Sequence, residues 1–187
     1  LLTYEPRGNE VMSGTLIMEP CNPEADFGVL YFEVGGWMPM CGHDTIGVGT
    51  ALVEAGMVEV QEPYTYVTLD TAAGLVKLQI EVRNCSAVSV TFVNAPAFVM
   101  VQDAEIRTGK YGTLRADIAY GGNIYAILPS ASVGLHINPQ SSMLLIEAGN
   151  YLKQRINEQI EVHHPTIPFE NHVTHIEFYE PTYQEDG

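Results

Sequence analysis

The sequence predicts an α+β protein that consists mainly of antiparallel strands around one buried helix. Its 187 residues are 46% apolar and 17% charged, a composition that can form a hydrophobic core. The 17 glycines and 11 prolines, together with many valines and threonines, indicate short strands separated by turns. Residues 43–55 form a helical pattern that leaves little polar surface. A helix that is apolar all round is buried, and strand-like segments on both sides suggest that a sheet encloses it.

The elements of the first half follow from the spacing of apolar residues and from turn signals. Residues 10–19 and 27–33 are predicted strands, and Gly35 and Gly36 end the second one. Gly56 is a plausible left-handed cap for the helix. Three further strands follow, and the alternation of apolar residues in the middle one favours antiparallel pairing with one solvated face; these strands are 64–70, 73–83 and 85–93.

The second half contains a hairpin and a second helix. A strand is predicted up to about residue 101, and a domain boundary near 107–112, where polar residues and glycines cluster. This boundary divides the chain into domains 1–108 and 109–187. The remaining predicted elements are two strands that pair across Gly121 and Gly122, an amphipathic helix and two short strands; they span 112–120, 123–129, 139–158, 160–164 and 172–179.

Charge and cysteine content exclude several classes of function. The formal charge is 8 − 23 = −15, which disfavours binding to nucleic acids and to anionic membranes. Apolar runs are too short to span a bilayer, and the odd number of three cysteines fits a reducing compartment such as the cytoplasm. His163 and His164 have no companion ligand at metal-binding spacing, so no metal is expected. The lysines lie in no motif typical of a pyridoxal cofactor, so none is expected.

The segment that carries chemistry is Met-Cys-Gly-His-Asp-Thr-Ile-Gly at residues 40–47. It places Cys41 on the loop that enters the buried helix, where free backbone amides can lower the pKa of a thiol. The same amides can bind a small carboxylate, and Gly42 allows the backbone to approach a ligand. In the alternative interpretation, Cys41 is a small buried hydrophobic residue and Gly42 only forms a turn.

The sequence GGWMPMCGHDTIGVGTA at residues 35–51 resembles the MCGH segment of the proline racemase family, which includes hydroxyproline 2-epimerases and trans-3-hydroxyproline dehydratases. Similar family segments occur in the same order along the chain: YEPRG at 4–8, TAAGLV at 71–76 and DIAYGGN at 117–123. Two family features, a His-Thr-Gly-Gly type strand and a second catalytic segment DRSPCGTG, do not occur. The resemblance therefore implies that the chain is an internal part of a longer protein.

The resemblance also implies a fold and an activity. The fold is of the diaminopimelate epimerase type, with two lobes that each curl a mostly antiparallel sheet around a central helix. The second lobe would be incomplete and would expose apolar residues such as Ile124, Ile127 and Leu128. The activity is a cofactor-independent epimerisation at the α-carbon of 4-hydroxyproline or proline, in which two cysteines transfer the proton. Cys41 would be one of them, with one cysteine missing from this chain, and Gly42 and His43 would hold the substrate carboxylate.

Two further positions bear on the substrate. By the resemblance, Ser13 occupies the place of a bulky residue in proline racemases, and His175 the place of a histidine that can meet a ring hydroxyl group. Alternatively, Ser13 only fills a strand and His175 points to solvent. Two other functions stay open: a trans-3-hydroxy-L-proline dehydratase, and a catalytically inert chain. The expected partner is a small molecule, and assembly into a homodimer is compatible with the resemblance.

Overall fold

The computed structural model describes residues 3–9 and 11–181, which form two compact units. Unit 1 comprises Leu1–Ala95 and unit 2 comprises Pro96–Gly187, and each is described by itself. The division lies one strand earlier than the boundary predicted at residue 108. Residues 109–111 instead form the turn between β7 (Phe98–Thr108) and β8 (Gly112–Tyr120). Polar residues and glycines mark a hairpin turn as readily as a linker, which explains the difference.

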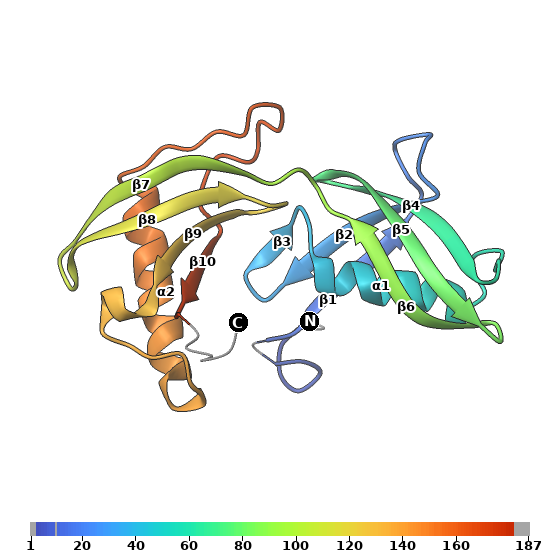
Figure 1. The fold of residues 1–187 in the computed structure, drawn as a ribbon, viewed down its shortest axis with the longest axis horizontal. Coiled ribbons are helices and arrows are strands. Elements are labelled where there is room, and N and C mark those ends of the chain that lie inside the picture. Colours follow the sequence, from blue (N-terminus) through green and yellow to red (C-terminus); the bar gives the residue numbers. More distant parts are fainter. Residues whose placement is uncertain (1–2, 10, 182–187) are drawn as a thin grey trace. The chain divides into compact units, whose positions relative to one another are not determined.

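Unit 1 consists of one curled sheet and one helix (Figure 1). Its strand order is β1-β2-β4-β5-β6, with β3 on β2, and all pairs are antiparallel except a short parallel contact between β2 and β4. The predicted strands are therefore confirmed, with small changes at their ends. The elements are β1 (Ser13–Met18), β2 (Phe27–Glu33), β3 (Gly36–Met38), α1 (Gly42–Glu54), β4 (Tyr64–Thr71), β5 (Gly74–Arg83) and β6 (Ser86–Val93).

Helix α1 lies against this sheet and contacts β1, β5 and β6. One face of the helix is buried, including Val48 and Leu52. Gly49 permits the close approach, since a Cβ atom there would lie 2.9 Å from Leu78 and 3.0 Å from Val90. The opposite face is open, and Ile46 is 44% exposed. The central helix is thus confirmed, but the prediction that it is buried on all sides is wrong, because within unit 1 the sheet covers only one face.

Unit 2 is a four-stranded sheet in the order β10-β9-β8-β7, with a helix packed on it (Figure 1). Its additional elements are β9 (Ile124–Pro129), β10 (His175–Tyr179), the 3-10 turns η1 (Ser130–Val133) and η2 (Pro139–Ser141), and α2 (Ser142–Asn157). The pair β9–β10 is parallel and the other pairs are antiparallel. The predicted hairpin and amphipathic helix are confirmed.

The apolar face of this sheet is covered rather than exposed. Ile124 and Leu128 are fully buried and Ile127 is half-buried, so the expected exposure of these residues is wrong. Alternate residues of β9 share one face of the sheet. Helix α2 packs on the sheet through a buried stripe at helical spacing, which consists of Ala148, Leu152 and Ile156.

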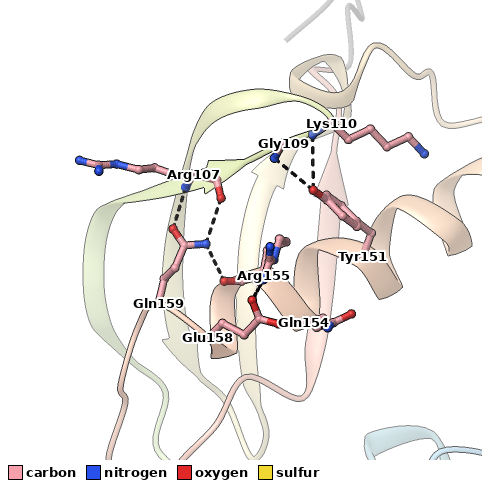
Figure 2. Close-up of polar contacts among 8 residues, drawn as sticks. All are labelled: Arg107, Gly109, Lys110, Tyr151, Gln154, Arg155, Glu158 and Gln159. Atoms are coloured by element: carbon pink, nitrogen blue, oxygen red, sulfur yellow. Dashed lines mark hydrogen bonds and ion pairs between the residues drawn. The ribbon is translucent and has the colours of Figure 1, made fainter.

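Figure 2 shows how α2 is tied to the end of the β7–β8 hairpin. The hydroxyl of Tyr151 accepts hydrogen bonds from the amides of Gly109 at 3.2 Å and Lys110 at 3.4 Å. The side-chain amide of Gln159 accepts from the Arg107 nitrogen at 2.9 Å and donates to the Arg107 oxygen at 3.0 Å. Gln159 thus satisfies both backbone groups of Arg107, as a neighbouring strand would.

The segment after α2 departs from the prediction. Residues 160–164 are not a strand. The Nδ1 atom of His164 accepts hydrogen bonds from the amides of Thr166 and Ile167, and its own amide donates to the Glu170 carbonyl at 2.9 Å. These residues therefore belong to a folded loop, in which Val162 is buried. Over the part of the chain that the structure describes, no helix has the length and apolar character needed to cross a membrane.

Candidate active site

Cys41 lies at the N-terminus of α1, as the sequence predicts. It is the N-cap residue, with extended backbone angles of φ −138° and ψ 112°, and its side chain is half-buried. Its carbonyl accepts the first helical hydrogen bond, from the amide of Thr45 at 3.0 Å. The thiol therefore stands beside the free amides of the first helical turn.

A buried chain of hydrogen bonds fixes this helix terminus. The hydroxyl of Thr45 donates to the Cys41 carbonyl at 2.7 Å and lies 2.7 Å from the hydroxyl of Tyr31. Since Thr45 has one hydroxyl proton, Tyr31 is the donor in the second bond. Tyr31 is fully buried, and burial raises its pKa to about 12, so it keeps this proton at neutral pH. The backbone at Cys41 is thus fixed by β2 as well as by the helix.

The pKa of the Cys41 thiol is raised above its ordinary value. Burial is the largest cause, and the negative charge of Asp44 also raises it. The backbone amides of Asp44 and His43 donate towards the sulfur and lower the pKa, but they do not outweigh burial. The expectation that the helix terminus yields a lowered thiol pKa is therefore wrong for this environment. The structure favours a protonated Cys41, which can act as an acid.

Ser13 lies beside the same helix turn. It begins β1 and is half-buried, and its Oγ donates a hydrogen bond to Oδ1 of Asp44 at 2.8 Å. The other oxygen, Oδ2, is buried and accepts no hydrogen bond from the described residues. The side chain of Ser13 therefore contacts the first turn of α1, and its role towards a substrate stays a prediction.

A groove of about 270 Å³ lies next to this pair, between β1 and α1. Thr15, His43 and Asp44 form its polar part, and Ile17, Val48 and Ala51 form its apolar part. The side chain of His43 is exposed. Neither Cys41 nor Ser13 lines the groove, although Gly14, His43 and Asp44, which are close to them in the sequence, do.

Gly42 begins α1 and packs closely against the sheet. A Cβ atom at this position would lie 3.1 Å from the Phe92 ring of β6. A side chain there would require a shift of Phe92 or of the helix terminus. Close packing is therefore a second reason for glycine, beside the predicted approach to a ligand.

His175 lies in unit 2, at the start of β10. It is half-buried, its Nδ1 lies 2.9 Å from the Thr174 hydroxyl, and its ring stacks on Tyr125 with 5.1 Å between centroids. The structure therefore does not support the interpretation that His175 simply points to solvent. Its contact with a substrate stays a prediction.

The structure brings Ser13, Cys41, Gly42 and His43 together in unit 1. Sequence reasoning gave no role to Asp44, although it quoted the residue within the motif. The missed signal was a carboxylate in the first turn of a helix, next to a candidate thiol. Cys21 and Cys85 are exposed, and the described residues contain no cluster of three or more side chains suited to a metal ion.

Comparison with known proteins extends over the whole chain. The sequence profile of the proline racemase family matches residues 1–187. The chain is 47% identical over 181 residues to the 4-hydroxyproline 2-epimerase of Streptosporangium roseum. This match covers 97% of this chain and 54% of the relative. It is 40% identical over 185 residues to the proline racemase of Clostridioides difficile, with 98% of this chain and 55% of that protein covered.

A solved structure supports the same relationship. The hydroxyproline epimerase of Agrobacterium vitis, crystallised with trans-4-hydroxy-L-proline, matches with a TM-score of 0.90 and 40% identity. The match covers 97% of this chain and 53% of that one, and it confirms the α+β fold that the resemblance implies. The chain thus spans about half the length of the relatives it matches. These matches show that the chain belongs to the proline racemase family.

Proposed function

We propose that this chain is the Cys41-bearing part of a cofactor-independent epimerase that inverts the α-carbon of 4-hydroxyproline. The observation that carries the proposal is the placement of a half-buried thiol at the N-terminus of α1, beside a serine hydroxyl held by Asp44. The family relationship supports a reaction at the α-carbon of proline or a hydroxyproline.

The chemical step is a proton exchange at a weakly acidic C–H bond next to a carboxylate. Two groups on opposite faces of the α-carbon are needed, one to remove the proton and one to return it. In this proposal a second cysteine, which this chain does not supply, removes the proton as a thiolate. Cys41, whose pKa is raised by burial, donates its thiol proton to the other face. The amides of Gly42 and His43 stabilise the negative charge that develops on the substrate carboxylate.

One feature favours a hydroxylated ring over proline itself. Ser13 provides a hydroxyl group next to the thiol-bearing turn, and a buried substrate hydroxyl needs such a partner. His175 is proposed as a second contact for the ring hydroxyl group.

The test uses the natural protein that carries this chain, at the length its gene encodes. It is incubated with trans-4-hydroxy-L-proline without added cofactor, and the stereoisomers are separated by chiral chromatography. We expect the cis-4-hydroxy-D isomer to accumulate until the two epimers reach equilibrium. Absence of epimerisation with both hydroxyproline and proline would contradict the proposal. Loss of water from trans-3-hydroxy-L-proline would instead identify the dehydratase alternative.

The proposal also covers the cellular setting and the assembly of the enzyme. Three cysteines, all unpaired, fit the reducing conditions of the cytoplasm. Assembly as a homodimer stays a prediction, which sedimentation equilibrium of the natural protein would test.

A further inference from the structure

Asp44 has no assigned role in the proposed reaction, yet it contacts the proposed specificity residue. We infer that Asp44 is a positioning residue: its carboxylate holds the hydroxyl proton of Ser13, so that Ser13 meets the substrate only as a hydrogen-bond acceptor and thereby selects a ring that carries a hydroxyl group. This inference rests on the proposed function.

The direction of the hydrogen bond follows from counting protons. A carboxylate can only accept hydrogen bonds, and a serine hydroxyl has one proton and two lone pairs. The 2.8 Å contact between Ser13 Oγ and Asp44 Oδ1 therefore uses the only proton of Ser13. Asp44 lies in the first turn of α1, where an acidic side chain interacts favourably with the helix dipole. The lone pairs of Ser13 Oγ are left for a donor from outside.

Both partners are held by rigid elements. Ser13 begins β1 and is paired with Glu33 of β2. The next residue, Gly14, is paired with Phe32 of β2, and the Phe32 ring packs so closely on it that a Cβ atom there would lie 2.6 Å away. Asp44 is fixed by the helix. The acceptor direction of Ser13 is therefore set before any substrate arrives.

An acceptor of this kind discriminates between the two candidate substrates. The ring hydroxyl group of 4-hydroxyproline can donate to Ser13, whereas the corresponding methylene of proline cannot. The hydrogen bond that Ser13 donates to the carboxylate of Asp44 also polarises the serine oxygen and makes it a better acceptor. Sites that are built to bond a substrate hydroxyl discriminate strongly against analogues that lack it.

The test is a double-mutant cycle on the natural protein, with Ser13→Ala, Asp44→Ala and the double variant. The readout is the ratio of kcat/KM for trans-4-hydroxy-L-proline to that for L-proline. Asp44 also affects Cys41, but that effect acts on both substrates and cancels in the ratio. We expect each single variant to lower the ratio about tenfold, the size of one hydrogen bond, and the double variant to lower it no further.

Two more variants keep the test decisive. In Asp44→Asn the amide oxygen can still accept the serine proton, so it should retain more of the ratio than Asp44→Ala, and it replaces that variant if alanine prevents folding. Glu24→Gln removes one negative charge at an exposed position of unit 1 and should leave the ratio unchanged. If Ser13→Ala and Asp44→Ala lowered the kcat/KM ratio additively, or if Asp44→Ala left the ratio unchanged, this inference would be overturned while the proposed function stood. No turnover of either substrate by the unmodified protein would overturn the proposed function and the inference together.

Discussion

Replacing Thr45 by valine is expected to destabilise unit 1 by about 2–4 kcal/mol, although valine has nearly the same shape. Thr45 and Tyr31 are both fully buried, and the Thr45 hydroxyl is the acceptor for the Tyr31 hydroxyl and a donor to the Cys41 carbonyl. Thr45→Val removes both hydrogen bonds and leaves the Tyr31 hydroxyl buried without its acceptor. The Tyr31 donor left unsatisfied costs about 1–3 kcal/mol, and the lost bond to the Cys41 carbonyl adds about 1 kcal/mol.

Tyr31→Phe is the matched comparison. It removes one hydrogen bond but leaves Thr45 bonded to the Cys41 carbonyl, so we expect a loss of only about 1 kcal/mol. Adding Tyr31→Phe to Thr45→Val removes the orphaned hydroxyl and should recover part of the loss. This non-additivity is the signature of a shared network.

Urea unfolding followed by tryptophan fluorescence measures these differences. Trp37 is the only tryptophan, and its ring lies edge-on to Phe32 with 5.9 Å between centroids, so its emission reports on unit 1. The expected order of stability is unmodified protein, Tyr31→Phe, then Thr45→Val. If Tyr31→Phe destabilised unit 1 as much as Thr45→Val, the proposed donor and acceptor directions would be refuted.

Three other predictions concern charge and packing. Asp44→Asn removes a charge that raises the pKa of Cys41, so at a pH below that pKa the variant's Cys41 should be alkylated faster than that of the unmodified protein. Peptide mass spectrometry measures the alkylation, and an unchanged rate would contradict this prediction. Gly49→Ala should cost about 1–3 kcal/mol by overpacking against Val90, and an unchanged urea midpoint would refute it. Burial raises the pKa of the Glu170 carboxyl group, so the stability that this group contributes in its protonated form is lost as the pH rises through the folded-state pKa. Glu170→Gln should therefore stabilise the protein at pH 7 but not below about pH 4, where the carboxyl group is protonated in both states. Equal effects at both pH values would disprove this.

Local periodicity was sufficient to predict most of the fold. The alternation in residues 73–83 predicted β5, and the apolar residues of 139–158 at helical spacing predicted α2. Periodicity failed where a strand and a loop can have the same alternation of apolar residues. Ile160 and Val162 alternate like a strand, but they lie in a loop that His164 closes. The full apolar pattern of 43–55 could not reveal that one helix face would be open in unit 1.

The candidate site was predictable in its residues but not in its electrostatics. The position of Cys41 at a helix entrance follows from local sequence. The sign of its pKa shift depends on how deeply the sheet buries the thiol, which is a tertiary property. Ser13 and Asp44 are 31 positions apart in the sequence, and they meet only because α1 packs against β1.

The central claim is that Cys41 transfers a proton at the α-carbon of the substrate. Incubation of the natural protein with trans-4-hydroxy-L-proline in deuterated water, followed by mass spectrometry, measures deuterium entering Cα. The account predicts incorporation by the unmodified protein and by Cys21→Ser, in which an exposed thiol is removed from the same unit. A folded Cys41→Ser variant should form no deuterated cis-4-hydroxy-D isomer above background, because the face opposite the second cysteine then lacks its proton donor. Full incorporation and epimerisation by Cys41→Ser would contradict the claim.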